Sequence, residues 1–439
     1  MATKMFPLNT SGGVGRMAQR EPRFFFLFIS RRNSMLGPFP IPHNFGVESF
    51  PKSVMELRLN AFSAVIRSKH EWHIKRRDPN IVEKWQADAI AQHITPEQFK
   101  YVIDELEYYD KLRNGSVEVA DVDGVWKAPQ LFPQHLCSEF ARHLARLTDI
   151  LDSHKDWHPG SNEVVLDVIH PGLYLFVSGK TRTIKPDHAN CPNGLPTTLP
   201  QPEIGFNQFT STDYQWIPTP VEVDKEGKVT FLSYVNNLHP IRHKDLYPVL
   251  ADMFSLTLPL FERVLTFLKS PLNPKFDLGR FEIYETQDEP DKREDEDYDA
   301  YDRRLEDWYQ NRPINPIPIP TFTEPSTRPS VVLRSCRLQV IVKIQEIHLT
   351  PDRPVYEGGV WHVEGMRNER IVATAIYYYD CSNITECKLS FRQAVGEPDY
   401  DQDDHRGVEA VWGLSDGEPL VQTLGSVITK ASTSSILLD

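Results

Sequence analysis

The run CRLQVIVKIQEIHLT, residues 336–350, constrains the fold more than any other stretch of the chain. Its residues alternate in character, and successive side chains of a β-strand point to opposite faces. The run therefore predicts a long strand with one apolar face and one partly polar face that can line a cavity. The apolar face comprises Leu338, Val340, Val342 and Ile344, and the other face comprises Gln339, Ile341, Lys343 and Gln345.

The rest of the last third predicts further strands. The runs ERIVATAIYYYD, KLSFRQ, EAVWG and GSVITK follow at short intervals with turn residues between them, which is typical of an antiparallel barrel or sandwich. In contrast, residues 53–151 space their apolar side chains in helical steps, as in SVMELRLNAFSAVIRSK. Residues 246–269 predict one long apolar helix, or two helices broken at Pro259. We therefore predict an α+β protein in which helices flank a β-rich core.

Shifts in composition divide the chain into five predicted parts. These are a basic disordered leader at 1–40, a mainly helical flank at 41–160, a mixed strand and helix part of the core at 161–281, an acidic and then proline-rich insert at 282–330, and a β-barrel core at 331–439. Residues 282–307 hold 13 acids and 4 bases and so carry most of the formal net charge of -13. We expect this acidic part to be solvated.

The composition also argues against two kinds of partner. A chain with a net charge of -13 and no basic stripe is a poor ligand for nucleic acid. The most apolar run, FFFLFI at residues 24–29, is far shorter than the roughly 20 residues that a membrane-spanning helix needs. Five cysteines without CxxC spacing favour a reducing compartment, so we expect a cytoplasmic protein. The alternative is a mitochondrial presequence, because residues 1–40 hold six bases and one acid.

The stretch GGVWHVEGMRNE, residues 358–369, contains the best candidate metal ligands. On a strand, His362 and Glu364 would point to the same face, because one residue separates them. An imidazole and a carboxylate placed this way form two thirds of a facial triad that holds non-haem Fe(II). The pattern HxE is common, so a surface His and Glu at the end of a strand is the alternative.

Several long blocks carry a family resemblance. The blocks DWHPGSNEVVLDVIHP, SYVNNLHP, LQVIVKIQEIHLTPDRPVYEGGVWHVEGMRNERIVATAIYYYDCSNIT and YDQDDHRGVEAVWG together resemble a fungal domain-of-unknown-function family whose core is similar to the Fe(II)/2-oxoglutarate-dependent oxygenases. The likeness covers about residues 40–430. It implies a double-stranded β-helix of the cupin or jelly-roll type, with Fe(II) bound by His362 and Glu364 and 2-oxoglutarate as co-substrate.

The resemblance also implies a distal His and an Arg on a strand after GSVITK. The sequence instead continues as ASTSSILLD after Lys430, so we expect the core to lack its last strands and the C-terminus to be truncated. His405 is the only His that follows His362 and is therefore a weak candidate for the third ligand. Its neighbours Asp403 and Asp404 favour a solvated turn instead.

Other residues are candidates for the pocket. Trp361, Asn368 and Tyr377 are expected in its wall, and Lys343 and Gln339 are expected to bind the co-substrate. Lys343 could equally form a buried salt bridge with Glu364 or Glu346. His158, His170 and His239 lie beside or near prolines, and we expect them to form hydrogen bonds in turns and not to bind metal.

The sequence therefore favours an Fe(II)/2-oxoglutarate-dependent oxygenase that acts on a small organic substrate, such as an amino acid or a fungal metabolite, and that is impaired in this chain by loss of the distal His. One alternative is an inactive or non-catalytic β-barrel binding protein. Another is a cupin-like enzyme that uses a different metal without 2-oxoglutarate. The sequence identifies no protein partner, and it lacks the GxSxG, GxGxxG and P-loop patterns.

Overall fold

The structure of the chain is a computed structural model. The described residues are 2–5, 8–9, 22–30, 50–183, 195–196, 210–269, 275–276, 278, 282–284, 289–326, 330–381, 383–400, 403–430 and 433–438. Helices and antiparallel sheets are combined, which confirms the α+β prediction. Residues 10–21 and 31–40 of the predicted leader lie outside the described residues.

The elements follow the chain in this order. The helices are α1 (Val54–Arg67), α2 (Trp72–Lys75), α3 (Pro79–Ala91), α4 (Pro96–Leu112), α5 (Gln134–Thr148), the 3-10 turn η1 (Asp152–His154), α6 (Leu246–Lys269), α7 (Tyr298–Asn311) and α8 (His405–Trp412). The strands are β1 (Ala2–Met5), β2 (Leu8–Asn9), β3 (Pro22–Ser30), β4 (Glu118–Val119), β5 (Trp126–Pro129), β6 (Val165–Ile169), β7 (Phe176–Val177), β8 (Arg182–Thr183), β9 (Leu195–Pro196), β10 (Tyr214–Gln215), β11 (Thr219–Val223), β12 (Val229–Phe231), β13 (Cys336–Ile347), β14 (Val355–Tyr356), β15 (Ile371–Cys381), β16 (Cys387–Ala394), β17 (Val421–Thr429) and β18 (Thr433–Leu438).

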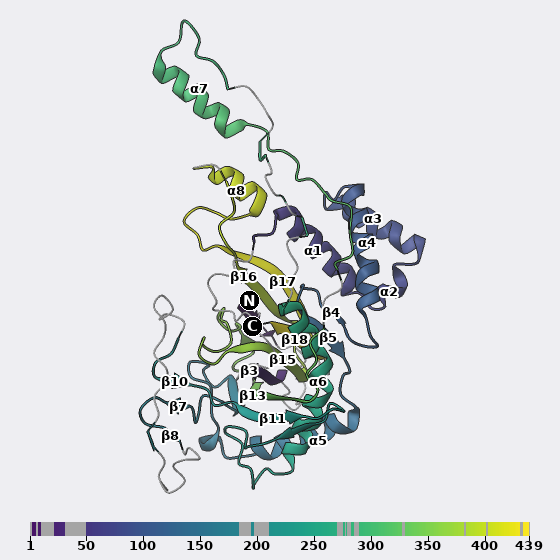
Figure 1. Cartoon of the computed structure of the whole chain (residues 1–439), viewed down its shortest axis with the longest axis vertical. Coiled ribbons are helices and arrows are strands. Elements are labelled where there is room, and N and C mark those ends of the chain that lie inside the picture. Colours follow the sequence, from purple (N-terminus) through teal and green to yellow (C-terminus); the bar gives the residue numbers. More distant parts are fainter. Residues whose placement is uncertain are drawn as a thin grey trace.

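One large sheet organises the molecule. It has nine strands in the order β12-β11-β13-β3-β15-β18-β5-β4, with β6 pairing with β13 outside this path. A second sheet contains β1, β16 and β17. Within the described residues the large sheet is open, with β12 and β4 at its ends, so a closed barrel is not formed. Helices α5 and α6 lie along one face of the sheet (Figure 1).

The predicted alternation of β13 is confirmed. Leu338, Val340, Val342 and Ile344 all belong to the larger core, between the sheet and the helices. Ile341 belongs to a second core, which also contains Phe391 of β16 and Val427 of β17. The large sheet is therefore buried on both faces, and the small sheet covers the face that carries Lys343 and Gln345.

The predicted disordered leader is wrong for Pro22–Ser30. This segment is β3, and it pairs with β13 on one side and β15 on the other. Phe25, Leu27 and Ile29 face the larger core, and Phe26 faces the second core. A strand buried on both faces reads as a continuous apolar run, which explains why FFFLFI lacks alternation.

Two predictions about the last hundred residues are also wrong. Residues 433–438 form β18, which pairs with β15 and β5 and so satisfies two strand edges that would otherwise be open. The expectation that no strand follows Lys430 therefore fails. The run EAVWG lies at the end of helix α8, where Val411 and Trp412 pack into a small core of their own.

The helical predictions are largely confirmed. Helix α4 begins with a capping box, in which the side chains of Thr95 and Gln98 each accept a hydrogen bond from the other's backbone. Helix α6 is one unbroken helix that contains Pro259. Phe254 and Phe261 are completely buried on either side of this proline. Their burial outweighs the backbone hydrogen bond that the proline removes.

The acidic insert contains an element that the sequence did not predict. Residues 298–311 form α7, which has no buried residue and projects away from the body of the molecule (Figure 1). Asp297 caps this helix by accepting a hydrogen bond from the backbone of Ala300 at 2.7 Å. The exposed surface of α7 agrees with the expected solvation of the insert.

Candidate functional site

The candidate ligands His362 and Glu364 lie in the connection between β14 and β15. This connection is irregular, so the predicted placement of both residues on a strand is wrong. The chain turns at Gly365, whose φ is +74°. The buried Glu369 then accepts hydrogen bonds from the backbone of Trp216 at 2.7 Å and of Met366 at 2.6 Å. His362 is a single β-bridge residue and Glu364 lies in a bend, so the turn that follows, and not a regular strand, positions the pair.

The two side chains nevertheless meet. His362 Nδ1 lies 2.8 Å from the carbonyl oxygen of Val360, and His362 Nε2 lies 3.3 Å from Glu364 Oε1. A neutral imidazole with its proton on Nδ1 satisfies Val360 and leaves a lone pair on Nε2. That lone pair and the carboxylate oxygen then face each other. The two atoms must share a proton or a cation.

The electrostatics keep Glu364 ionised. Burial alone would raise its pKa, but the hydrogen bond with His362 and the charge of Lys343 outweigh burial and lower the pKa below its ordinary value. The same hydrogen bond raises the pKa of His362. The side chain of Glu364 is 12% exposed and that of His362 is 47% exposed, so the imidazole is the part of the pair that solvent reaches.

The structure brings Lys343 toward this pair. Its charge acts on both Glu364 and His362, and its ammonium lies 5.3 Å from the ring centre of Phe26. Gln339 lies on the same face of β13, four residues earlier. The alternative partner Glu346 is held elsewhere, by Arg23, His348 and Tyr379.

Trp361 and Asn368 support the loop. The guanidinium of Arg392 lies 4.2 Å from the ring centre of Trp361. The side-chain oxygen of Asn368 accepts a hydrogen bond from the backbone of Ser211 at 3.1 Å, and its amide donates to Gln215 at 3.3 Å. These contacts tie the loop to the segment around β10.

Tyr377 lies on the wrong face of the sheet to line this site. Its hydroxyl is 3.1 Å from Sγ of Cys137 on α5, and its ring packs edge-on against Phe132 at 4.6 Å. The strand register explains the error. Tyr377 pairs with Phe25, whereas Lys343 pairs with Phe26, and neighbouring residues of a strand face opposite ways.

His405 does not join the pair. It is the first residue of α8, and its Nδ1 lies 3.8 Å from Asp416 Oδ1. In the described part of the chain, one group of three or more His, Cys, Asp or Glu residues has ligand atoms close enough to share an ion. That group contains neither His405 nor His362.

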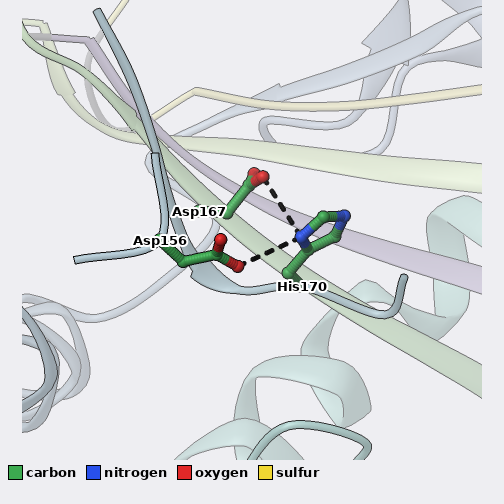
Figure 2. Close-up of side chains that lie close together, drawn as sticks. All are labelled: Asp156, Asp167 and His170. Atoms are coloured by element: carbon green, nitrogen blue, oxygen red, sulfur yellow. Dashed lines mark hydrogen bonds and ion pairs between the residues drawn. The ribbon is translucent and has the colours of Figure 1, made fainter. Parts of the chain in front are cut away.

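The group consists of Asp156, Asp167 and His170, whose ligand atoms lie within 4.8 Å of one another. Figure 2 shows both carboxylates pointing toward the His170 ring. His170 Nδ1 lies 3.2 Å from Asp156 Oδ2 and 3.3 Å from Asp167 Oδ2. His158 Nδ1 lies 2.9 Å from the same oxygen of Asp167. The expectation that His158 and His170 form hydrogen bonds is therefore confirmed, although their partners are carboxylates.

Both aspartates border a pocket of about 600 Å³. Its lining also includes the cationic residues Lys155 and Arg242 and the three histidines His154, His239 and His243. His239 Nδ1 accepts hydrogen bonds from the backbone of Ile241 and Arg242 at 3.2 and 3.3 Å, as expected for a histidine in a turn.

The family of the chain follows from two sequence matches. Residues 96–434 match the family model described as a protein of unknown function (DUF4246), and residues 17–88 match the model of its N-terminal domain. The chain belongs to the DUF4246 family. No curated protein and no solved structure matches it.

The DUF4246 match includes the pair His362 and Glu364 and the cluster around Asp167, and the match to the N-terminal domain includes β3. None of the helices described in this DUF4246 chain is long and apolar enough to cross a membrane.

We did not predict this cluster from the sequence. Its residues all occur in DWHPGSNEVVLDVIHP, which contains Asp156, His158, Asp167 and His170. The available signal was the repeated pairing of Asp with His, once before β6 and once at its end.

Proposed function

We propose that this DUF4246 chain has the fold and the metal-binding half-site of an Fe(II)/2-oxoglutarate-dependent oxygenase that acts on a small organic substrate, such as an amino acid or a fungal metabolite. The proposal rests above all on the contact between His362 Nε2 and Glu364 Oε1 at 3.3 Å. A jelly-roll core is part of the same proposal, and the two sheets packed across the second core support it.

The pair fits a divalent ion in three respects. Two neighbouring ligands of an octahedral ion with bonds of about 2.1 Å lie about 3 Å apart, close to the distance observed. Glu364 is ionised, as a ligand must be. The carbonyl of Val360 fixes the histidine tautomer that offers Nε2, in the way that outer hydrogen bonds orient metal-binding histidines.

Lys343 supplies the second part of the proposal. Its ammonium acts on the pair through space and carries no ion pair with the described residues within 4 Å. An anionic keto acid bound beside His362 would therefore meet a cation on the sheet. When bound, Fe(II) and 2-oxoglutarate together supply O2 activation coupled to decarboxylation of the keto acid. The residues of the chain hold, orient and charge-balance these groups.

The proposal is tested by succinate formation from 2-oxoglutarate in air with added Fe(II). We expect the wild-type chain, whose pair has no third protein ligand among the described residues, to form succinate slowly. The variant His362→Ala should form at least tenfold less, and His405→Ala should match the wild type. Equal turnover in wild type and His362→Ala would refute the role of the pair. Absence of turnover in the wild type would favour the non-catalytic binding protein.

A further inference from the structure

A second cluster, distinct from the His362–Glu364 pair, surrounds strand β6. Asp156 precedes the strand, Asp167 lies within it, and His170 follows it directly. The three side chains converge from these separate positions (Figure 2). We propose that Asp156, Asp167 and His170 bind a divalent metal ion at the wall of the neighbouring pocket. This proposal does not rest on the oxygenase function.

The single N–H of His170 does not satisfy both carboxylates that approach it. His170 Nδ1 lies at nearly equal distances, 3.2 and 3.3 Å, from one oxygen of Asp156 and one of Asp167. A single N–H bond points along one line and cannot serve both oxygens well. Two carboxylates therefore converge on one ring nitrogen. A divalent cation would accept a lone pair from all three groups at once.

Asp167 is held in place for such a role. Its side chain is 0% exposed, its Oδ1 accepts a hydrogen bond from Gln345 of β13, and its Oδ2 accepts one from His158. A buried carboxylate is costly unless charges or hydrogen bonds compensate it. Gln345 and His158 thus resemble the outer partners that orient metal-binding carboxylates.

The position of His170 is set by a glycine. A Cβ atom on Gly172 would lie 2.9 Å from His170 Nε2, which is too close for an ordinary contact. The missing side chain at residue 172 therefore lets the ring pack with Nε2 against the backbone and Nδ1 toward the carboxylates. This gives a variant that disturbs the ring without removing a ligand.

The pocket gives an ion and its further ligands a way in. Asp156 and Asp167 both line the cavity of about 600 Å³. Lys155 lies beside them but is paired at 2.7 Å with Asp152, which is 88% exposed. Two carboxylates and one imidazole suit a borderline or hard divalent ion such as Mn(II), and Mn(II) can be detected directly.

The test is a Mn(II) titration followed by electron paramagnetic resonance, in which bound ions lose the signal of free Mn(II). The background is His362→Ala, so that the first candidate pair cannot contribute. We expect this chain to bind one Mn(II), and addition of Asp156→Asn to weaken that binding at least tenfold. The matched control is Glu163→Gln, an exposed acid of the same segment whose partner Arg353 does not line the pocket, and it should bind Mn(II) as the background does.

Gly172→Ala provides a second variant in case Asp156→Asn does not fold, as judged by circular dichroism. It keeps every ligand but displaces His170, so it should also weaken binding at least tenfold. Absence of bound Mn(II) in the His362→Ala background would overturn the proposal and leave a hydrogen-bonded network only. Unchanged binding in folded Asp156→Asn or Gly172→Ala would overturn it as well.

Discussion

His362 Nε2 lies 3.3 Å from Glu364 Oε1, although both residues belong to an irregular loop and not to a strand. The contact thus depends on the turn that follows it, which is built around Gly365 and Glu369. The integrity of this turn is therefore as important to the candidate site as the two ligands themselves.

Gly365→Ala should destabilise this turn more than a glycine replacement in open space. Its φ is +74°, and a Cβ atom there would lie 2.5 Å from Glu369 Oε2 and 2.9 Å from Cδ1 of Ile371. The control is Gly417→Ala, which has a φ of +73° and no atom within 4 Å of the added Cβ. The control measures the backbone cost alone, about 1–2 kcal/mol.

We expect Gly365→Ala to lower the free energy of unfolding by about 1–3 kcal/mol more than Gly417→Ala does, which is the usual cost of overpacking. Urea denaturation of the two variants gives the comparison. Equal losses in both variants would show that the loop accommodates the added methyl group without strain.

The buried ion network around Lys275 should be essential for stability. Its ammonium lies 2.6 Å from Glu105, 3.1 Å from Asp123 and 2.6 Å from the side-chain oxygen of Asn60. Lys275→Met removes one of the two cations that balance the buried carboxylates, which costs about 3–5 kcal/mol of unfolding free energy. The control is the exposed ion pair of Lys111 with Glu324. Lys111→Met should cause no measurable change in the free energy of unfolding. A small loss for Lys275→Met in urea denaturation would contradict this assignment.

Asp123 should make the protein sensitive to acid. Burial alone would raise its pKa, but the charges of Lys275 and Arg67 and the hydrogen bond from Tyr109 lower it well below the ordinary value of 3.8. A carboxyl with a lowered folded-state pKa contributes stability that is fully present above its unfolded pKa and is lost as the pH falls toward the folded one. The loss should therefore begin near pH 4 and continue below it.

The measurement is the free energy of unfolding at pH 7, 4 and 3 for the wild type and for Asp123→Asn. We expect the wild type to lose more stability between pH 4 and pH 3 than the variant does. Parallel pH profiles would show that Asp123 is not responsible for the acid sensitivity.

Strand β3 should be required for folding. Leu27 is 1% exposed and lies between β13 and β15. Leu27→Ala should therefore lower the free energy of unfolding by about 2–5 kcal/mol, as for other large-to-small changes in a core. Val360→Ala is a suitable control, because Val360 is 78% exposed. Removal of residues 1–40 without loss of soluble expression would contradict the central placement of β3.

The sequence was a good guide wherever one element determines its own pattern. Alternation in β13 and helical spacing in α1 to α5 are local properties, and both were predicted correctly. Predictions from the sequence were wrong where pairing with other strands determines the structure. Tyr377 has strand periodicity, but only its pairing with Phe25 shows which face it takes. Residues 22–30 read as an isolated apolar run, because only pairing with β13 and β15 reveals a strand buried on both faces.

In the candidate site, too, a local contact was predicted and a long-range cluster was missed. One intervening residue was enough to predict that His362 and Glu364 meet, although it predicted the wrong local structure. The cluster of Asp156, Asp167 and His170 was missed, because its members come from before, within and after strand β6, and their spacing alone does not show that they meet. Gln345, which holds Asp167, lies 178 residues away along the chain.

The most direct test of the central claim is an anaerobic titration of the 439-residue chain with Fe(II) and 2-oxoglutarate. A keto acid bound to iron through two oxygens gives a visible charge-transfer band. We predict this band for the wild type and for His405→Ala, and its loss in His362→Ala and Glu364→Gln. Absence of the band in the wild type, or an unchanged band in His362→Ala, would contradict a metal site at His362 and Glu364.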